Sequence, residues 1–330
     1  MSLSRRAAAL GFVLAASTAG ATDFGRPAIG TTGAEFLLLD TTARGIAMGS
    51  AMAAVTDDAS SIYWNPAGLA KVPRLSATFM HAQYVADMSY EAASYAQRVN
   101  DASVIAGGVR YLDGGSIPRT DLQGVANGSF NPRSYVAEAG WGQSIYDLSD
   151  SEMDVSMGVT ARLIRTDLGL GAVNGYGTDF GIQSRFFTTA QAYDVALAVQ
   201  NVGAGQKFDQ VRDTLPTRIR FGGAVKPIRT LSLSIEGIAP INDAPYVAAG
   251  AEYTLEVERG ITGFFRAGVN TLTYESLGMS STLSLGLGLK LNDLTFDYAF
   301  VPMGVLGTAT HRLSISFNLP AKISRRYRER

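Results

Sequence analysis

From residue 75 onward, the sequence repeatedly alternates apolar residues with polar or small ones. In the segment 283–290, leucine occupies every odd position, and serine, glycine or lysine every even one. The segments 231–236, 294–300 and 313–318 follow the same period. Because successive side chains of a β-strand point to opposite faces, this period predicts strands with one apolar face. We therefore expect an all-β protein, although a soluble sandwich and a membrane barrel both satisfy the alternation.

The connections between the predicted strands favour the barrel. We predict about fourteen strands, most of them about ten residues long, which suits a tilted crossing of the hydrocarbon layer. They span 75–84, 88–98, 102–112, 134–146, 152–166, 175–187, 192–202, 216–226, 230–239, 245–255, 261–270, 279–290, 293–300 and 310–319. Short connections at 100–101, 147–151, 188–191, 227–229 and 292 alternate with mostly longer ones at 113–133, 167–174, 203–215, 271–278 and 301–309. Outer-membrane barrels keep short turns at the periplasmic rim and longer loops outside. The sequence therefore predicts a transmembrane antiparallel β-barrel.

Composition agrees with this prediction and excludes several classes of function. Hydrophobic residues make up 46% of the chain and charged residues 17%, yet no run after the N-terminus approaches the length of a membrane-spanning helix. A net charge of −1 offers no electrostatic footprint for nucleic acid. The absence of cysteine excludes disulfides, thiolate metal sites and cysteine nucleophiles. We expect no metal or other cofactor.

The first residues predict export. Arg5 and Arg6 precede an apolar run over 7–16, and the small residues at 19–21 offer a cleavage site. We therefore predict a signal peptide over 1–21 and localisation to the outer membrane of a Gram-negative-type envelope. At the other end, residues 320–330 are predicted to form a basic tail in the periplasm.

The segment 44–70 is dense in small residues and helix-start signals, unlike the rest of the chain. Asp57 and Asp58 stand where a short helix needs a cap, and Asn65 with Pro66 places a cap and a first-turn proline before a second turn. We predict two short helices inside a hatch, or plug, over 22–74, with the barrel over 75–319. Small residues allow its backbone to approach the surrounding wall; they are Gly45, Ala47, Gly49, Ala51, Ala53 and Ala54.

This segment resembles the N-terminal signature of the PorV/PorQ family, barrels related in architecture to the FadL long-chain fatty-acid transporters. The matching residues of the hatch are Arg44, Gly45, Met48, Gly49, Asp57, Asp58, Tyr63, Trp64, Asn65, Pro66, Ala67 and Gly68. The resemblance continues into the segments 116–121, 200–203, 297–302 and 311–314. It implies a barrel of about fourteen strands whose N-terminal segment folds into the lumen.

For function, the resemblance implies two hypotheses of different classes. PorV-like members serve type IX secretion, binding secreted proteins by a C-terminal signal domain and passing them to a surface-attachment complex. FadL-like relatives admit hydrophobic small molecules through a lateral opening. We favour a non-enzymatic secretion accessory, because the matching motifs extend into the loops. Its expected partners are outer-membrane lipid and secreted proteins or secretion-system components; a hydrophobic small molecule is the partner in the transport hypothesis. A purely structural barrel is the third hypothesis.

Charged residues on the presumed inner face are expected to pair with one another or with Arg44, Asp57 and Asp58, because buried charges need partners. These lumen candidates are Asp194, Arg218, Arg220, Glu236 and Asp297. The two histidines, His81 and His311, have no catalytic or metal-ligand constellation around them in the sequence. For His311 we predict a structural hydrogen bond.

Overall fold

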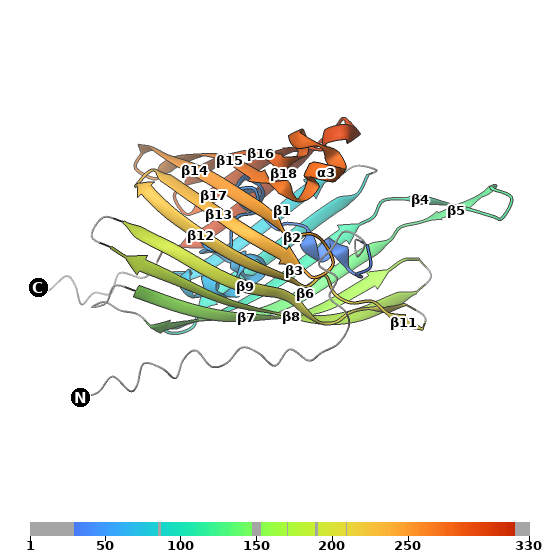
Figure 1. The fold of residues 1–330 in the computed structure, drawn as a ribbon, viewed down its shortest axis with the longest axis horizontal. Helices are drawn as coiled ribbons and strands as arrows, with labels where there is room; N and C mark the ends of the chain where they lie inside the picture. The colour runs from blue at the N-terminus through green and yellow to red at the C-terminus, as the bar shows by residue number, and fades with distance from the viewer. Residues whose placement is uncertain are drawn as a thin grey trace, which may run out of the picture.

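Fourteen strands close into one antiparallel barrel in the computed structural model, which describes residues 30–84, 87–146, 153–169, 171–188, 191–208 and 210–320 (Figure 1). Each strand pairs with its neighbours in chain order, and the first pairs with the last to close the wall. In chain order they are β1 (Leu75–Gln83), β2 (Ser89–Arg98), β3 (Ser103–Asp113), β6 (Arg133–Tyr146), β7 (Met153–Asp167), β8 (Ala172–Phe187), β9 (Ala192–Ala204), β12 (Arg218–Ile228), β13 (Leu231–Pro240), β14 (Tyr246–Glu258), β15 (Ile261–Asn270), β16 (Leu283–Leu291), β17 (Leu294–Pro302) and β18 (Ala309–Leu319). The predicted all-β barrel is confirmed.

The two faces of the wall explain the alternation of the sequence. On β16, Leu285 and Leu287 are exposed on the outside, whereas Ser284 is buried on the inside. Large apolar side chains cover the outer face along the other strands as well, where they suit contact with lipid. The inner face carries small, polar and charged residues that pack against chain segments inside the barrel.

Several strand boundaries lie a few residues from the predicted ones, and two of these shifts change a predicted element. Residues 279–282 form a 3₁₀ turn, η6 (Met279–Thr282), after Gly278 at a φ of 86°, so β16 begins later than expected. The predicted loop over 167–174 is shorter than expected, because the pairing of β7 with β8 continues to Asp167 and Ala172. Gly169, in this connection, adopts a φ of 79°.

The two rims of the barrel differ, as predicted. One rim carries the hairpin of β4 (Ile117–Thr120) and β5 (Ala126–Phe130), which projects beyond the wall, and the small sheet of β10 (Lys207–Phe208) and β11 (Val211–Arg212) (Figure 1). The same rim carries η5 (Thr271–Thr273), α3 (Tyr274–Leu277), η6 and η7 (Gly304–Leu306). At the opposite rim, residues 229–230, 259–260 and 292–293 suffice to connect neighbouring strands. We call these the long-loop rim and the short-turn rim; the predicted turn 147–151 lies outside the described residues.

Residues 30–74 run lengthwise through the barrel. Thr32 pairs with Thr214 at the long-loop rim, and Leu75 starts β1 at the short-turn rim. Between these points lie η3 (Glu35–Leu38), α1 (Ala43–Ala47), α2 (Ser61–Trp64) and η4 (Pro66–Lys71). The helix α1 contacts β15 to β18 on one side of the barrel. The turn η4 contacts β3 and β6 to β8 on the other, so the wall surrounds the segment.

The described hatch therefore has more helical turns than the two that we predicted. The additional turns are η3 and α1; Thr42 caps α1 by accepting a hydrogen bond from Gly45 N at 3.2 Å. No helix in the described ranges is long and apolar enough to cross a membrane. The predicted signal peptide (1–21), the first residues of the predicted hatch (22–29) and residues 321–330 of the predicted tail lie outside the described residues.

Candidate functional site

Tyr63 and Trp64 form the centre of the hatch. Their rings meet edge to face, with centroids 4.8 Å apart, and both side chains are buried. Gly45 lies against the Trp64 indole so closely that a Cβ at this position would lie 2.1 Å from a ring carbon. Met48 and Met52 complete the cluster. The small and aromatic residues of the sequence signature therefore pack against each other, and Gly45 makes that approach possible.

Arginines from the wall cover these two rings. The guanidinium carbons of Arg110 and Arg218 lie 5.2 and 5.8 Å from the Tyr63 ring centroid, and that of Arg220 lies 5.3 Å from Trp64. Such distances allow cation–π attraction, which is strongest where water is excluded. Arg218 also donates a hydrogen bond to the Tyr63 hydroxyl at 3.1 Å. Burial raises the pKa of Tyr63 to about 12, so its hydroxyl remains protonated and donates to the Leu38 carbonyl.

Asn65 and Pro66 form the predicted cap and first-turn proline. The Asn65 side-chain oxygen accepts from Ala67 N at 3.1 Å, and its amide nitrogen donates to the Ala53 carbonyl at 3.0 Å. On the facing wall, a Cβ at Gly158 would lie 2.2 Å from the Pro66 carbonyl group. This part of the hatch therefore packs directly against the wall backbone, where a glycine leaves room for it.

Asp57 and Asp58 behave differently from the predicted pair of caps. Asp58 Oδ1 accepts from Ser60 N at 2.8 Å, so it caps the turn before α2; Ser60, the residue at the N-cap of α2, makes no side-chain cap. Burial, with a smaller contribution from Asp57, raises the pKa of Asp58. Asp57 instead pairs with Arg44, at 3.1 Å.

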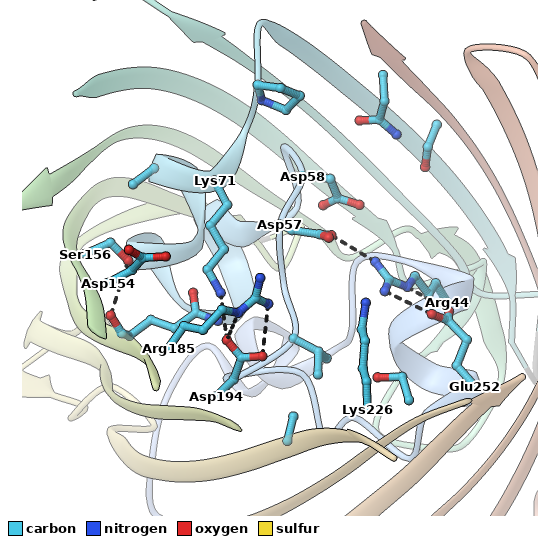
Figure 2. Close-up of a pocket in the computed structure, with 18 of the residues that line it drawn as sticks. Arg44, Asp57, Asp58, Lys71, Asp154, Ser156, Arg185, Asp194, Lys226 and Glu252 are labelled. Atoms are coloured by element: carbon cyan, nitrogen blue, oxygen red, sulfur yellow. Dashed lines mark hydrogen bonds and ion pairs between the residues drawn. The ribbon is translucent and has the colours of Figure 1, made fainter. Parts of the chain in front are cut away.

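Ion pairs join the hatch to the wall near the short-turn rim, as Figure 2 shows. Arg44 Nε lies 3.0 Å from Glu252 Oε2, and Lys71 Nζ lies 3.3 Å from Asp194 Oδ1. Arg185 also pairs with Asp194, at 2.9 Å. Burial lowers the pKa of Lys71, and the Asp194 carboxylate opposes that effect.

The other predicted lumen charges are also placed on the inner face. Arg220 pairs with Glu236, and the Glu236 carboxylate accepts from the hatch amide Ala53 N at 2.9 Å. Asp297 pairs with Arg266 at 2.6 Å. The fifth, Arg218, has neutral partners: the Tyr63 hydroxyl described above and the side-chain oxygen of Gln200, at 2.7 Å.

A cavity of about 760 Å³ lies between the hatch and the short-turn rim (Figure 2). Hatch residues Arg44, Asp57 and Lys71 line it on one side. Wall residues that include Asp154 and Lys226 line it on the other. We call it the vestibule. Because charges of both signs surround it, the vestibule is suited to water and ions and poorly suited to an apolar solute.

Sequence reasoning missed a buried network in the wall. Arg110 donates to Glu138 at 2.5 Å, and Arg162 pairs with both Glu138 and Asp179. Asp179 also accepts from the backbone N of Asn201, which adopts a φ of 60° at a β-bulge between β8 and β9. The sequence does contain a signal for these residues, because each charged residue occupies an inner-face position of an alternating strand.

The comparison with protein families decides the classification. Residues 22–236 match the family described as type IX secretion system protein PorV. The chain belongs to the PorV family. The match covers the whole described hatch and the wall from β1 into β13. Membership places this barrel in the outer membrane. Barrels of that membrane generally keep their short turns on the periplasmic side. A comparison with curated protein sequences finds no match.

Solved structures with the same fold are outer-membrane transport barrels. The toluene transporter TbuX of Ralstonia pickettii superposes with a TM-score of 0.56 at 14% identity, covering 85% of this chain and 99% of that one. The Pseudomonas putida toluene transporter TodX gives 0.53 at 11%, covering 84% and 98%. A Pseudomonas aeruginosa FadL homologue gives 0.52 at 10%, covering 84% and 98%. At these identities the likeness shows the fold alone, and it confirms the FadL-like architecture of this PorV-family barrel.

Both histidines lie on the outer face of the barrel. His81 Nδ1 lies 3.0 Å from Glu91 Oε1, and His311 Nδ1 lies 2.7 Å from the Tyr298 hydroxyl, which confirms the structural hydrogen bond predicted for His311. Among the described residues, no group of three or more His, Cys, Asp or Glu side chains is placed to hold a metal ion.

Proposed function

We propose that this PorV-family barrel is a non-enzymatic accessory of protein secretion, whose long-loop rim binds secreted proteins or components of a type IX secretion system. The observation that carries the proposal is the family match over residues 22–236, which includes both hatch and wall. It extends through β4 and β5 and through β10 and β11, the loop elements on the side where such partners would bind.

A second observation supports a protein-binding rim. The segments 271–282 and 303–308, which we call the loop cap, expose Met279 and Val305 with relative exposures of 75% and 76%. The two segments pack on each other, since a Cβ at Gly304 would lie 1.8 Å from the Leu277 carbonyl oxygen. Glu275 is the one charged residue in these segments. An ordered apolar surface with little charge is typical of the centre of a protein interface.

The lumen also favours the accessory role over transport. The hatch is held to the wall by ion pairs at Glu252 and Asp194 and by hydrogen bonds from Arg220 and Gln200 to its backbone carbonyls. An apolar solute that passed through the lumen to the short-turn rim would have to displace these contacts and then cross the charged vestibule. Moving such a solute along this route requires desolvation of charged groups, which is costly.

Transport of hydrophobic small molecules is the second candidate, and the fold shared with toluene transporters favours it. It requires that the hatch move. The two candidates therefore differ in what should be lost when the protein is removed from its cell: surface-attached secreted proteins in the first, uptake of an apolar solute in the second.

The test is complementation of a deletion strain. The double variant Met279→Asp/Val305→Asp should reduce surface delivery of proteins with a C-terminal secretion signal domain by about tenfold, as expected for central interface residues. Val99→Asp is the matched control, because Val99 is exposed between β2 and β3 at the short-turn rim, opposite the loop cap. Normal delivery in the deletion strain, with impaired toluene uptake, would reject the accessory role.

A further inference from the structure

The outer wall carries a groove of about 630 Å³ across β1, β2, β3 and β6 to β8. Its apolar part is a row of outward side chains on adjacent strands, each paired directly with the next. The row is Phe79, Ala93, Val109, Ala137, Leu163 and Tyr176. The alanines in this row form the floor, because the larger side chains on either side of them rise above it. The groove is therefore open to the lipid side of the wall.

The next row of outward residues, toward the long-loop rim, is polar and aromatic. It runs through His81, Glu91, Tyr111, Tyr135, Arg165 and Asn174, each of which stands two residues from the end of its strand. The Tyr111 and Tyr135 rings lie 5.0 Å apart, and Arg165 donates to Asn174 at 3.2 Å. Arginine carries five N–H donors, so the exposed Arg165 has donors left for a further acceptor.

We propose that this groove binds a two-chain lipid with a phosphate headgroup in the outer leaflet. One acyl chain would lie over Ala137, between Val109 and Leu163, and the phosphate would accept hydrogen bonds from Arg165. The polarity of the groove matches an outer-leaflet lipid, whose headgroup lies toward the long-loop rim and whose chains point into the membrane. Arginine suits phosphate because its planar fork donates two hydrogen bonds at once.

The occupant follows from the position of the groove. It opens on the apolar outer face that an outer-membrane barrel presents to lipid. A second groove, of about 490 Å³ over β13 to β17, has Ala251 on its floor. No charged residue lines that second groove. It is therefore suited to acyl chains without preference for a headgroup, and it serves as an internal control.

The experiment is native mass spectrometry of the full-length protein in mild detergent, incubated with dioleoyl phosphatidic acid or with dioleoylglycerol, which lacks the phosphate. The wild type should retain the phosphatidic acid about tenfold better, as one charge-assisted contact predicts. Arg165→Gln should reduce retention to the level of dioleoylglycerol. Ala137→Trp, which fills the floor, should remove the preferred adduct, whereas Ala251→Trp should leave it unchanged.

Folding of each variant is checked by its heat-modifiable migration on gels. Equal retention of the two lipids by the wild type would overturn the proposal, as would wild-type retention by folded Ala137→Trp. A co-purifying protein that Ala137→Trp releases, in place of lipid, would also overturn it. The accessory role in secretion does not depend on any of these outcomes, since it is tested on the loop cap.

Discussion

At Gly158, the wall and the hatch leave no space for a side chain. A valine there would bring its Cβ to 2.2 Å from the Pro66 carbonyl group. Overpacking of this kind typically costs about 1–3 kcal/mol, and displacement of the hatch relieves it. We therefore expect Gly158→Val to raise ion conductance in planar bilayers. Gly237→Val is the control, because nothing lies within 4 Å of a Cβ at that site. Unchanged conductance in a folded Gly158→Val barrel would contradict a tightly packed hatch.

Burial should give the Arg162–Asp179 ion pair a much larger effect on stability than the His81–Glu91 pair. Asp179 is fully buried and binds both Arg162 and the Asn201 amide. Removing one partner of a buried pair typically costs about 3–5 kcal/mol, so Asp179→Ala should lower the temperature at which the barrel loses its compact migration on gels. The His81–Glu91 pair is half exposed, and His81→Gln should change stability by about 1 kcal/mol at most. A similar shift for both variants would refute this contrast.

Glu35 makes the outer end of the hatch sensitive to pH. Burial raises the pKa of Glu35 above its ordinary value of 4.5, although hydrogen bonds from Thr32 and Asn242 oppose the shift. The folded hatch therefore favours the protonated carboxyl. Its contribution is fully present below pH 4.5 and is lost as the pH rises through the raised pKa.

Residues 30–38 should accordingly be better protected from hydrogen exchange at pH 4 than at pH 7, after correction for intrinsic exchange rates. Glu35→Gln carries no titrating proton and should abolish that difference. The same pH dependence in Glu35→Gln as in the wild type would assign the effect to another group.

At the scale of elements, Asn65 connects three segments. Its oxygen caps η4, and its amide donates to carbonyls of the hatch loop and of β8. Asn65→Asp keeps the cap acceptor and loses both donors, whereas Asn65→Ala loses all three bonds. Loss of a cap alone typically costs about 1 kcal/mol. Asn65 is fully buried, so one oxygen of an aspartate would face the Ala53 and Ile182 carbonyls and bury a charge, which costs more than a lost cap. We therefore expect protease cleavage within 50–74 to increase from wild type to Asn65→Ala to Asn65→Asp. Less cleavage of Asn65→Asp than of Asn65→Ala would show that the cap bond matters more than the two donors.

Elements with a local signal were predictable from the sequence, and those without one were not. The strands follow from a period of two, and η4 follows from the adjacent pair Asn65 and Pro66. By contrast, η3 has a left-handed Ala34 and no side-chain cap at its start. The cap of α1, Thr42, was overlooked, and α1 also depends on strands more than 200 residues away along the chain. Such turns depend on tertiary packing, which no local pattern reports.

The candidate site divides in the same way. Arg220 and Glu236 were expected to find partners because they occupy inner-face positions of neighbouring strands, and they pair with each other. Glu252 was missed, although it binds Arg44 from the hatch and Arg266 from β15. Its role depends on how the hatch lies across the lumen. That arrangement requires the register of the whole wall and not the sequence of any one strand.

For the whole molecule, the question is whether the hatch moves during function. A Cβ added at Gly222 would lie 3.4 Å from the Ala53 Cβ, close to the Cβ separation in disulfides. The natural chain has no cysteine, so two introduced cysteines could pair only with each other. The variant Ala53→Cys/Gly222→Cys should therefore cross-link hatch and wall on oxidation. We expect the locked barrel to deliver secreted proteins as well as its reduced form does. Loss of delivery on oxidation, restored by reductant, would mean that the hatch must move.

The lengthwise course of residues 30–74 also constrains how the molecule is assembled. Thr32 lies at the long-loop rim and Leu75 at the short-turn rim, and the pairing of β1 with β18 seals the wall between them. In a completed barrel, the free end of the segment could reach its place at Thr32 only by passing from the short-turn rim through the lumen. The wall approaches the hatch closely at Gly158, Gly250 and Gly268, which leaves little width for that passage. We therefore expect the hatch to lie in place before β1 meets β18, so that insertion of the barrel and folding of its interior are coupled.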